Sequence, residues 1–194
     1  KEGWFLPAQH LIQFFVPDFF GNPATLNYWG VWNYGEFIGY IGILPLLFAI
    51  FALFYRYDKK TLFFGSIFFL SLIFALPTWF AKIPYILHLP FISTSQPTRL
   101  MFLTDFSLAI LAALGLDYFL RTKEKKRILL PLAFMLLVYL LLWGFILLNP
   151  SQNTTVAKNN LYLPTLTFIT ISALIITPLI FTKIKNKLPL LIFV

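Results

Sequence analysis

The fold of this chain is decided by LMFLTDFSLAILAALGLDYFL at Leu100–Leu120, RTKEKKR at Arg121–Arg127, and ILLPLAFMLLVYLLLWGFILL at Ile128–Leu148. At about 1.5 Å per residue, each apolar run is long enough to cross roughly 30 Å of hydrocarbon. Lipid offers the backbone no hydrogen-bond partner, so each run must be a helix. The sequence therefore predicts two membrane-spanning helices joined by a short basic loop.

The same pattern continues on both sides of this pair. Further apolar runs predict spans at Phe37–Tyr55, Thr61–Phe80 and Leu161–Phe181, and Leu188–Val194 is interpreted as a truncated sixth span. No signal-peptide order is visible at Lys1, and the chain ends inside an apolar run that is too short to span, so we expect both ends to be cut from a longer protein. We predict an all-α, polytopic transmembrane helix bundle over residues 37–194, preceded by an outer segment over residues 1–36. Kinks are expected at three prolines inside the spans: Pro45, Pro77 and Pro178.

The composition excludes an ordinary soluble domain. Hydrophobic residues make up 59% of the chain and charged residues only 11%, against roughly a quarter charged in soluble domains. One water-soluble core cannot hide so much apolar surface, so the solvent must be lipid. The absence of cysteine excludes disulfides and thiolate metal sites.

The basic residues alternate between loops. Most of them follow the first, third and fifth predicted spans, and the opposite side carries only Lys1, Lys82, Arg99 and Lys158. Basic loops face the cytoplasm, so the pattern predicts a multi-pass membrane protein, in contact with membrane lipids, whose first, third and fifth spans are each followed by a cytoplasmic segment. A nucleic-acid patch would not alternate in this way, so we interpret the net charge of +8 as a topology signal. The basic clusters are Arg56, Lys59 and Lys60; Arg121, Lys123, Lys125, Lys126 and Arg127; and Lys183, Lys185 and Lys187.

The predicted outer segments are longer and more varied than the basic loops. They are Lys1–Glu36, Ala81–Arg99 and Asn149–Asn160. The short cytoplasmic loops cannot form a nucleotide pocket, and no glycine-rich phosphate loop is present. We therefore expect the chemistry on the outer face. The first segment is rich in aromatic residues and predicts a short interfacial helix between Pro7 and Pro17, with Gln9 and Gln13 together on a polar face. The proline-rich 81–99 segment is expected at the outer interface.

Each carboxylate near or inside a predicted span is expected to have a structural or functional role, because burying a charge in lipid is costly. Asp117 lies four residues before Arg121, which predicts a helical ion pair at the boundary. Asp105 has no local cation, and either bonds to a neighbouring helix or lines an outer cavity. Glu36, with Tyr40 one turn below, is either solvated beside closely packed glycines or placed at a cavity rim.

Three further outer residues are candidates for ligand contact. Arg99, with Gln96 beside it, suits a phosphate, although a boundary arginine also contacts lipid headgroups. Asp18 is either a sugar or metal ligand or the first residue of a turn. The two histidines, His10 and His88, lack a metal-ligand spacing, and no metal site is predicted.

Two segments resemble a known family. Trp32–Leu47, WNYGEFIGYIGILPLL, resembles the "E…YIG-ILPLL" segment of bacterial YfhO-like membrane proteins, which are related to the GT-C glycosyltransferases. Gln96–Phe102, QPTRLMF, followed by Ala109–Asp117, AILAALGLD, resembles that family's "P-x-R … LAA-LGLD" span. With the Leu11–Gly21 stretch, which fits the outer loop before the first motif, the resemblance covers about Leu11 to Leu120.

The resemblance implies a multi-pass protein of the bacterial plasma membrane, a GT-C-like fold and an activity. The activity is sugar transfer from a polyprenyl-phosphate-linked donor to a cell-envelope polymer acceptor on the extracytoplasmic face. Arg99 would hold the lipid phosphate, Glu36 and Tyr40 would line the sugar cavity, and Asp105 would support it. The family's catalytic acidic residue would precede Lys1, so the catalytic residue stays unknown here. A divalent cation stays open as a cofactor.

Two other functions stay open. A transporter or flippase of lipid-linked substrates needs polar or broken helices near the midplane, and Asp105 is the candidate relay. A non-catalytic scaffold in an envelope assembly needs none of these polar residues.

Overall fold

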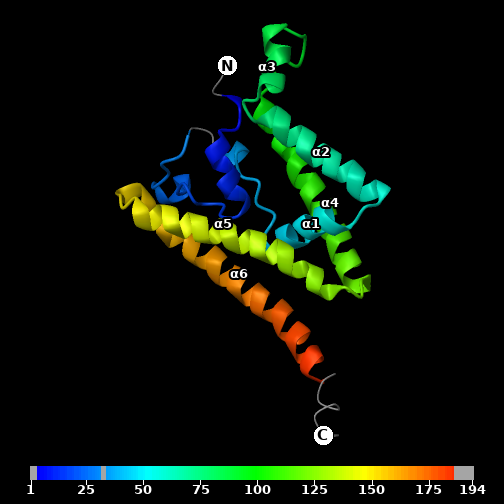
Figure 1. The fold of residues 1–194 in the computed structure, drawn as a ribbon. Coiled ribbons are helices and arrows are strands. Elements are labelled where there is room, and N and C mark those ends of the chain that lie inside the picture. The colour runs from blue at the N-terminus through cyan, green and yellow to red at the C-terminus, as the bar shows by residue number, and fades with distance from the viewer. Residues whose placement is uncertain (1–3, 32–33, 186–194) are drawn as a thin grey trace, which may run out of the picture.

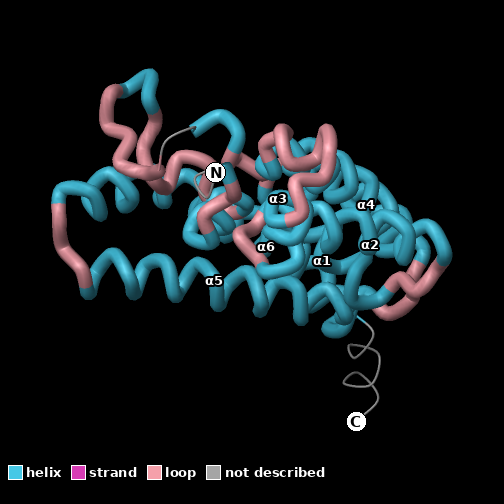
Figure 2. The backbone as a smooth tube through the Cα atoms, turned by 90° about the horizontal axis from the view of Figure 1, so that it is seen from above, coloured by secondary structure: helices cyan, strands magenta, loops and turns pink. Residues whose placement is uncertain are grey.

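The computed structural model describes residues 4–31 and 34–185, and these contain helices and loops but no strand (Figures 1 and 2). The predicted all-helical class is confirmed for this part of the chain. The truncated span at 188–194, Lys187, Lys1 and the Trp32-Asn33 start of the first motif lie outside it. Six α-helices follow one another: α1 Ile43–Tyr55, α2 Lys59–Ala75, α3 Trp79–Ile86, α4 Met101–Arg121, α5 Leu129–Leu148 and α6 Gln152–Lys185. Short 3-10 turns lie at Ala8–Phe14, Pro23–Thr25, Tyr34–Glu36, Pro97–Leu100 and Lys125–Ile128.

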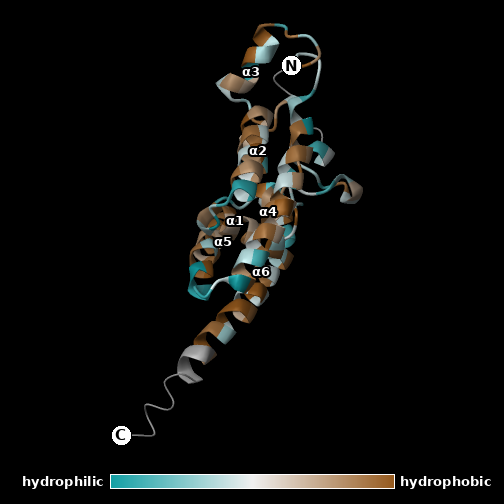
Figure 3. Cartoon of the chain, turned by 90° about the vertical axis from the view of Figure 1, so that its right-hand side faces the viewer, coloured by the Kyte–Doolittle hydropathy of each residue, from teal (hydrophilic) through white to brown (hydrophobic). Residues whose placement is uncertain are grey.

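Three helical stretches of the described chain are long and apolar enough to cross a membrane. They are Pro97–Arg121, Lys125–Leu148 and Gln152–Phe181, and they match the third, fourth and fifth predicted spans. Figure 3, which colours each residue by hydropathy, shows brown hydrophobic residues along these helices. The number of candidate spans rises to four if α2 and α3, whose axes differ by 64°, together form one broken span.

The first predicted span is shorter than expected. Helix α1 has 13 residues, about 20 Å, and starts at Ile43 rather than Phe37. Gly42 adopts a positive φ of 97°, which interrupts the helix on its N-terminal side. Gly35, Gly39 and Gly42 therefore precede the helix and do not form a helical packing face. The kink predicted at Pro45 is wrong. This proline lies in the first turn of α1, where backbone N–H groups have no carbonyl acceptor within the helix, so the missing N–H of proline breaks no helical hydrogen bond.

The second predicted span breaks near its end. Helix α2 ends at Ala75, and α3 starts at Trp79 after a turn that contains Pro77. Thr78 caps α3 by accepting a hydrogen bond from the Ala81 N–H at 3.2 Å. The break at Pro77 is therefore confirmed. Helix α6, in contrast, is assigned as continuous across Pro164 and Pro178.

Helix α4 packs against both α1 and α2 (Figure 1). Small residues allow the α1 and α4 backbones to come close, since Gly115 lies against the Phe48 carbonyl and the Ala52 methyl group. The Ser71 and Thr104 hydroxyls are 2.8 Å apart and link α2 to α4 in a buried hydrogen bond.

Helices α5 and α6 form an antiparallel hairpin. Trp143 Nε1 donates to Thr165 Oγ1 at 3.0 Å, and the rings of Tyr139 and Phe168 stack at 5.1 Å. One hydrophobic core joins this hairpin to α1 and to Phe19 and Phe20 of the N-terminal segment.

The N-terminal segment is folded into the bundle rather than laid on it as an amphipathic helix. The predicted helix appears as the 3-10 stretch Ala8–Phe14. The predicted polar face is wrong for Gln13, which is fully buried together with His10. These two polar side chains pair internally at 2.6 Å, and Gln13 Nε2 donates to the Pro17 carbonyl at 2.8 Å. Burial lowers the pKa of His10, against the opposing effect of its bond to Gln13.

Candidate functional site

A pocket of about 380 Å³ with both polar and apolar walls lies near the N-terminal ends of α1 and α6. The basic loops follow the C-terminal ends of α1 and α4, so the pocket belongs to the predicted outer side. Two of the predicted site residues, Asp18 and Tyr40, line it together. Asn159 and Asn160 of α6 supply amide groups, and the rest of the lining consists of Pro17, Leu163, Pro164 and Thr167.

Asp18 is held in place by hydrogen bonds from three elements. The Tyr34 hydroxyl and the Asn22 amide, the latter at 3.3 Å, donate to its Oδ1. The Asn160 amide donates to its backbone carbonyl at 2.6 Å, across 142 residues of sequence. No hydrogen bond from a described residue reaches Oδ2, so one carboxylate oxygen has capacity for a ligand hydroxyl.

The turn interpretation of Asp18 also applies. The Gly21 N–H donates to the Asp18 carbonyl at 2.9 Å. Burial, followed by the bond to Asp18, raises the pKa of Tyr34 to about 12. Tyr34 therefore stays protonated at neutral pH and keeps donating to the carboxylate. The result is a carboxyl group that is anchored in a turn at the wall of the pocket.

The asparagines of α6 were missed by sequence reasoning. Asn159 and Asn160 stand at the end of the predicted outer segment, where the apolar run of α6 begins. Two adjacent amides at that boundary were the available signal. Their position in the same pocket as Asp18 depends on how α6 packs against the N-terminal segment.

A second cluster joins the two motifs on which the family resemblance rests. Thr98 Oγ1 donates to Glu36 Oε2 at 2.6 Å, across 62 residues of sequence. With its amide turned so that the nitrogen faces the carboxylate, Gln96 donates to the two Glu36 oxygens at 3.2 and 3.3 Å. Arg99 follows directly, but its side chain is exposed and forms no ion pair or hydrogen bond with a described residue. Glu36 and Gln96 are thus brought together, with Arg99 next to them.

The predicted site residues do not form a single site. Neither Glu36, Gln96, Arg99 nor Asp105 lines the pocket that contains Asp18 and Tyr40. Asp105 is half-buried in α4, and its Oδ1 is buried without a hydrogen-bond partner among the described residues. One interpretation of the sequence gave Asp105 a hydrogen bond to a neighbouring helix. In the structure the adjacent residue, Thr104, forms such a bond, to Ser71 of α2.

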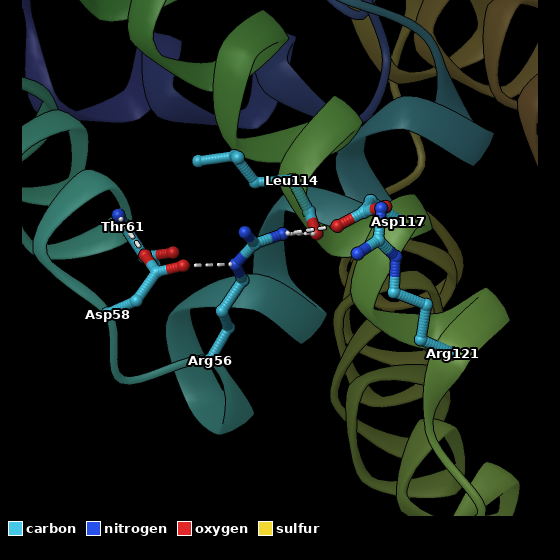
Figure 4. A network of polar contacts seen from close by, with 6 residues as sticks. All are labelled: Arg56, Asp58, Thr61, Leu114, Asp117 and Arg121. Carbon is cyan, nitrogen blue, oxygen red and sulfur yellow. Dashed lines mark hydrogen bonds and ion pairs between the residues drawn. The ribbon is translucent and has the colours of Figure 1, made fainter.

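The predicted ion pair at the basic end is confirmed and belongs to a larger network (Figure 4). Arg121 binds Asp117 at 2.7 Å. Arg56 reaches the same carboxylate at 3.1 Å, Asp58 at 2.7 Å and the Leu114 carbonyl at 2.7 Å. Arg56 therefore fastens the α1–α2 turn to the end of α4 and places the first two basic loops at the same end of the bundle.

The described residues offer no ready metal centre. Among residues 4–31 and 34–185, no group of three His, Asp or Glu side chains could hold a metal ion. His10 packs between the rings of Phe20 and Phe37 at 4.4 and 4.7 Å.

Comparison with known proteins adds no relative. No protein-family model matches the chain, and no curated protein or solved structure matches it significantly.

Proposed function

We propose that this chain is part of an integral, multi-pass plasma-membrane glycosyltransferase-like protein with a GT-C-like fold. It would bind a polyprenyl-phosphate-linked sugar on the extracytoplasmic face and pass the sugar to a cell-envelope acceptor. The resemblance of the Glu36 and Arg99 segments suggests this class, and the pocket of Asp18, Tyr40, Asn159 and Asn160 carries the proposal. Carboxylate, phenol and amide groups together offer the donors and acceptors that sugar hydroxyls need.

The two clusters support a division of labour. The Asp18 pocket would take the sugar, and the free Oδ2 of Asp18 would accept a sugar hydroxyl. Arg99, exposed beside the Glu36–Thr98 bond, would contact the phosphate of the donor. The catalytic base is left unassigned.

A pair of asparagines in α6 allows a clean test. Asn159 and Asn153 are both exposed, and neither side chain forms a hydrogen bond with a described residue, but only Asn159 lines the pocket. In transfer assays with the purified full-length protein and a polyprenyl-phosphate sugar, Asn159→Ala should raise the KM for the donor about two- to tenfold, as expected for one lost hydrogen bond. Asn153→Ala should leave it unchanged. Equal KM values in both variants would remove the pocket from the sugar site.

The rival transporter is favoured by one observation, the unpartnered oxygen of Asp105 inside a membrane-length helix. Movement of a lipid-linked sugar across liposomes that contain the protein, without covalent change, would support it. If Asp105→Asn abolished movement of the lipid-linked sugar while Asn159→Ala kept it at the wild-type rate, the result would favour a transporter over a glycosyltransferase.

A further inference from the structure

A groove of about 720 Å³ opens between the end of α1 and the first two thirds of α2. This volume lies in the range of small-molecule sites. Its two ends differ in chemistry. Arg56, Asp58 and Lys59 line the end at the α1–α2 loop, whereas Leu62, Phe69 and Leu70 line the part that lies deeper along α2.

We propose that this groove binds an anionic phospholipid of the cytoplasmic leaflet, with the headgroup at Lys59 and one acyl chain along α2. The inference is independent of the sugar-transfer proposal and uses none of its residues.

The length of the groove fits one leaflet. From Lys59 to Leu70 the helix rises about 16 Å, which is about half of the roughly 30 Å hydrocarbon core. The polar end coincides with the basic loop that is predicted to face the cytoplasm, so the change from polar to apolar follows the length of a phospholipid.

The floor of the groove depends on a glycine. A Cβ added to Gly65 would lie 3.1 Å from Leu53 Cδ2, so a side chain here would fill the space between α1 and α2. The walls are apolar and exposed, with 73% of Leu62 and 56% of Leu70 accessible. Surface of this kind is covered by hydrocarbon more favourably than by water or by a soluble anion.

The charge at the mouth favours an anion. The Arg56 guanidinium is bound by Asp58 and Asp117, and the other Asp58 oxygen accepts the Thr61 N–H at 2.8 Å. Lys59 is exposed, and its ammonium group has no hydrogen bond or ion pair with a described residue. Its charge is therefore available to a lipid phosphate.

Native mass spectrometry of the full-length protein in detergent tests the proposal. The protein is given equal amounts of palmitoyl-oleoyl phosphatidylglycerol and phosphatidylcholine, and glycerol phosphate serves as the soluble headgroup. We expect about fivefold more bound phosphatidylglycerol, which corresponds to the roughly 1 kcal/mol contributed by one lysine near anionic lipid. Glycerol phosphate should not displace it. An equal ratio of the two lipids, or displacement by glycerol phosphate, would overturn the proposal.

Three variants locate the site. Lys59→Gln should bring the ratio of the two lipids close to one. Ser66→Trp, at an exposed position on the groove wall, should lower the binding of both lipids several-fold. Gly144→Trp is the matched control, because no atom lies within 4 Å of a Cβ added there. If Ser66→Trp does not fold, Leu70→Trp blocks the same groove. Wild-type amounts of phosphatidylglycerol in a folded blocking variant would refute the site.

Discussion

Gly115 of α4 lies directly against the backbone carbonyl of Phe48 in α1, so that an added Cβ would come within 1.9 Å of that oxygen. Backbone atoms cannot yield as a flexible side chain can. The contact therefore sets how closely the two helices approach, and α1 holds its place in the bundle although it is too short to span a membrane alone.

Gly115→Ala should push α1 away from α4. We expect the free energy of unfolding to fall by about 1–3 kcal/mol, as for other overpacked cores. Thermal unfolding in neutral detergent, followed by circular dichroism, measures the loss. Gly144→Ala in α5 is the control, since it faces open space and should leave stability unchanged or raise it by up to about 1 kcal/mol. Equal stability of the two variants would contradict the close contact.

Thr98→Val should break the link between the two motif segments. It removes the hydroxyl that donates to Glu36 at 2.6 Å and leaves the carboxylate with one donor fewer. Because Glu36 is partly exposed, we expect a loss of about 1–2 kcal/mol in the free energy of unfolding. Thr98→Ser keeps the hydroxyl and should retain most of the stability. The same unfolding assay compares them, and indistinguishable transitions would argue against the bond.

Two arginines on one carboxylate should contribute unequally. The Arg56 side chain is 16% exposed and binds three groups, whereas that of Arg121 is 80% exposed and binds Asp117 alone. Arg56→Met should cost about 1–3 kcal/mol of stability, because it removes the donor from three acceptors, one in the α1–α2 turn and two on α4. Arg121→Met should cost less than about 0.5 kcal/mol, as is usual for exposed ion pairs. Chemical denaturation of both variants in detergent tests the ranking, which a larger loss for Arg121→Met would reverse.

Stability should fall in acid partly through Asp58. The Thr61 N–H, and after it Arg56, lower the pKa of this carboxyl from 3.8 to about 2. A lowered folded-state pKa stabilises the protein above 3.8, and this contribution disappears as the pH falls towards about 2. The free energy of unfolding, measured by denaturation between these pH values, should therefore drop less steeply in Asp58→Asn, which still caps α2. Identical slopes in both proteins would show that Asp58 does not contribute.

The apolar helices of the second half could be predicted because their pattern is local. From Leu100 to Phe181, long apolar runs and short polar loops predict helices whose ends differ from the observed ones by a few residues to about a turn. The exception is the start of α6, which lies at Gln152, about two and a half turns before the predicted start at Leu161. The pair Asp117 and Arg121 was predictable for the same reason, since four residues are one helical turn. The start of α1 was not predictable in this way, because the positive φ of Gly42, and not hydrophobicity, interrupts the helix before Ile43.

The amino-acid sequence by itself determined the helical class and the presence of apolar helices long enough to span a membrane, because both follow from composition and from the spacing of neighbouring residues. Only the tertiary structure decided that Asp18, Tyr40 and Asn160 share one pocket, that Glu36 meets Thr98, and that Arg56 reaches Asp117. These contacts join residues that are far apart in the chain, and their distances depend on how closely the helices pack rather than on any local pattern.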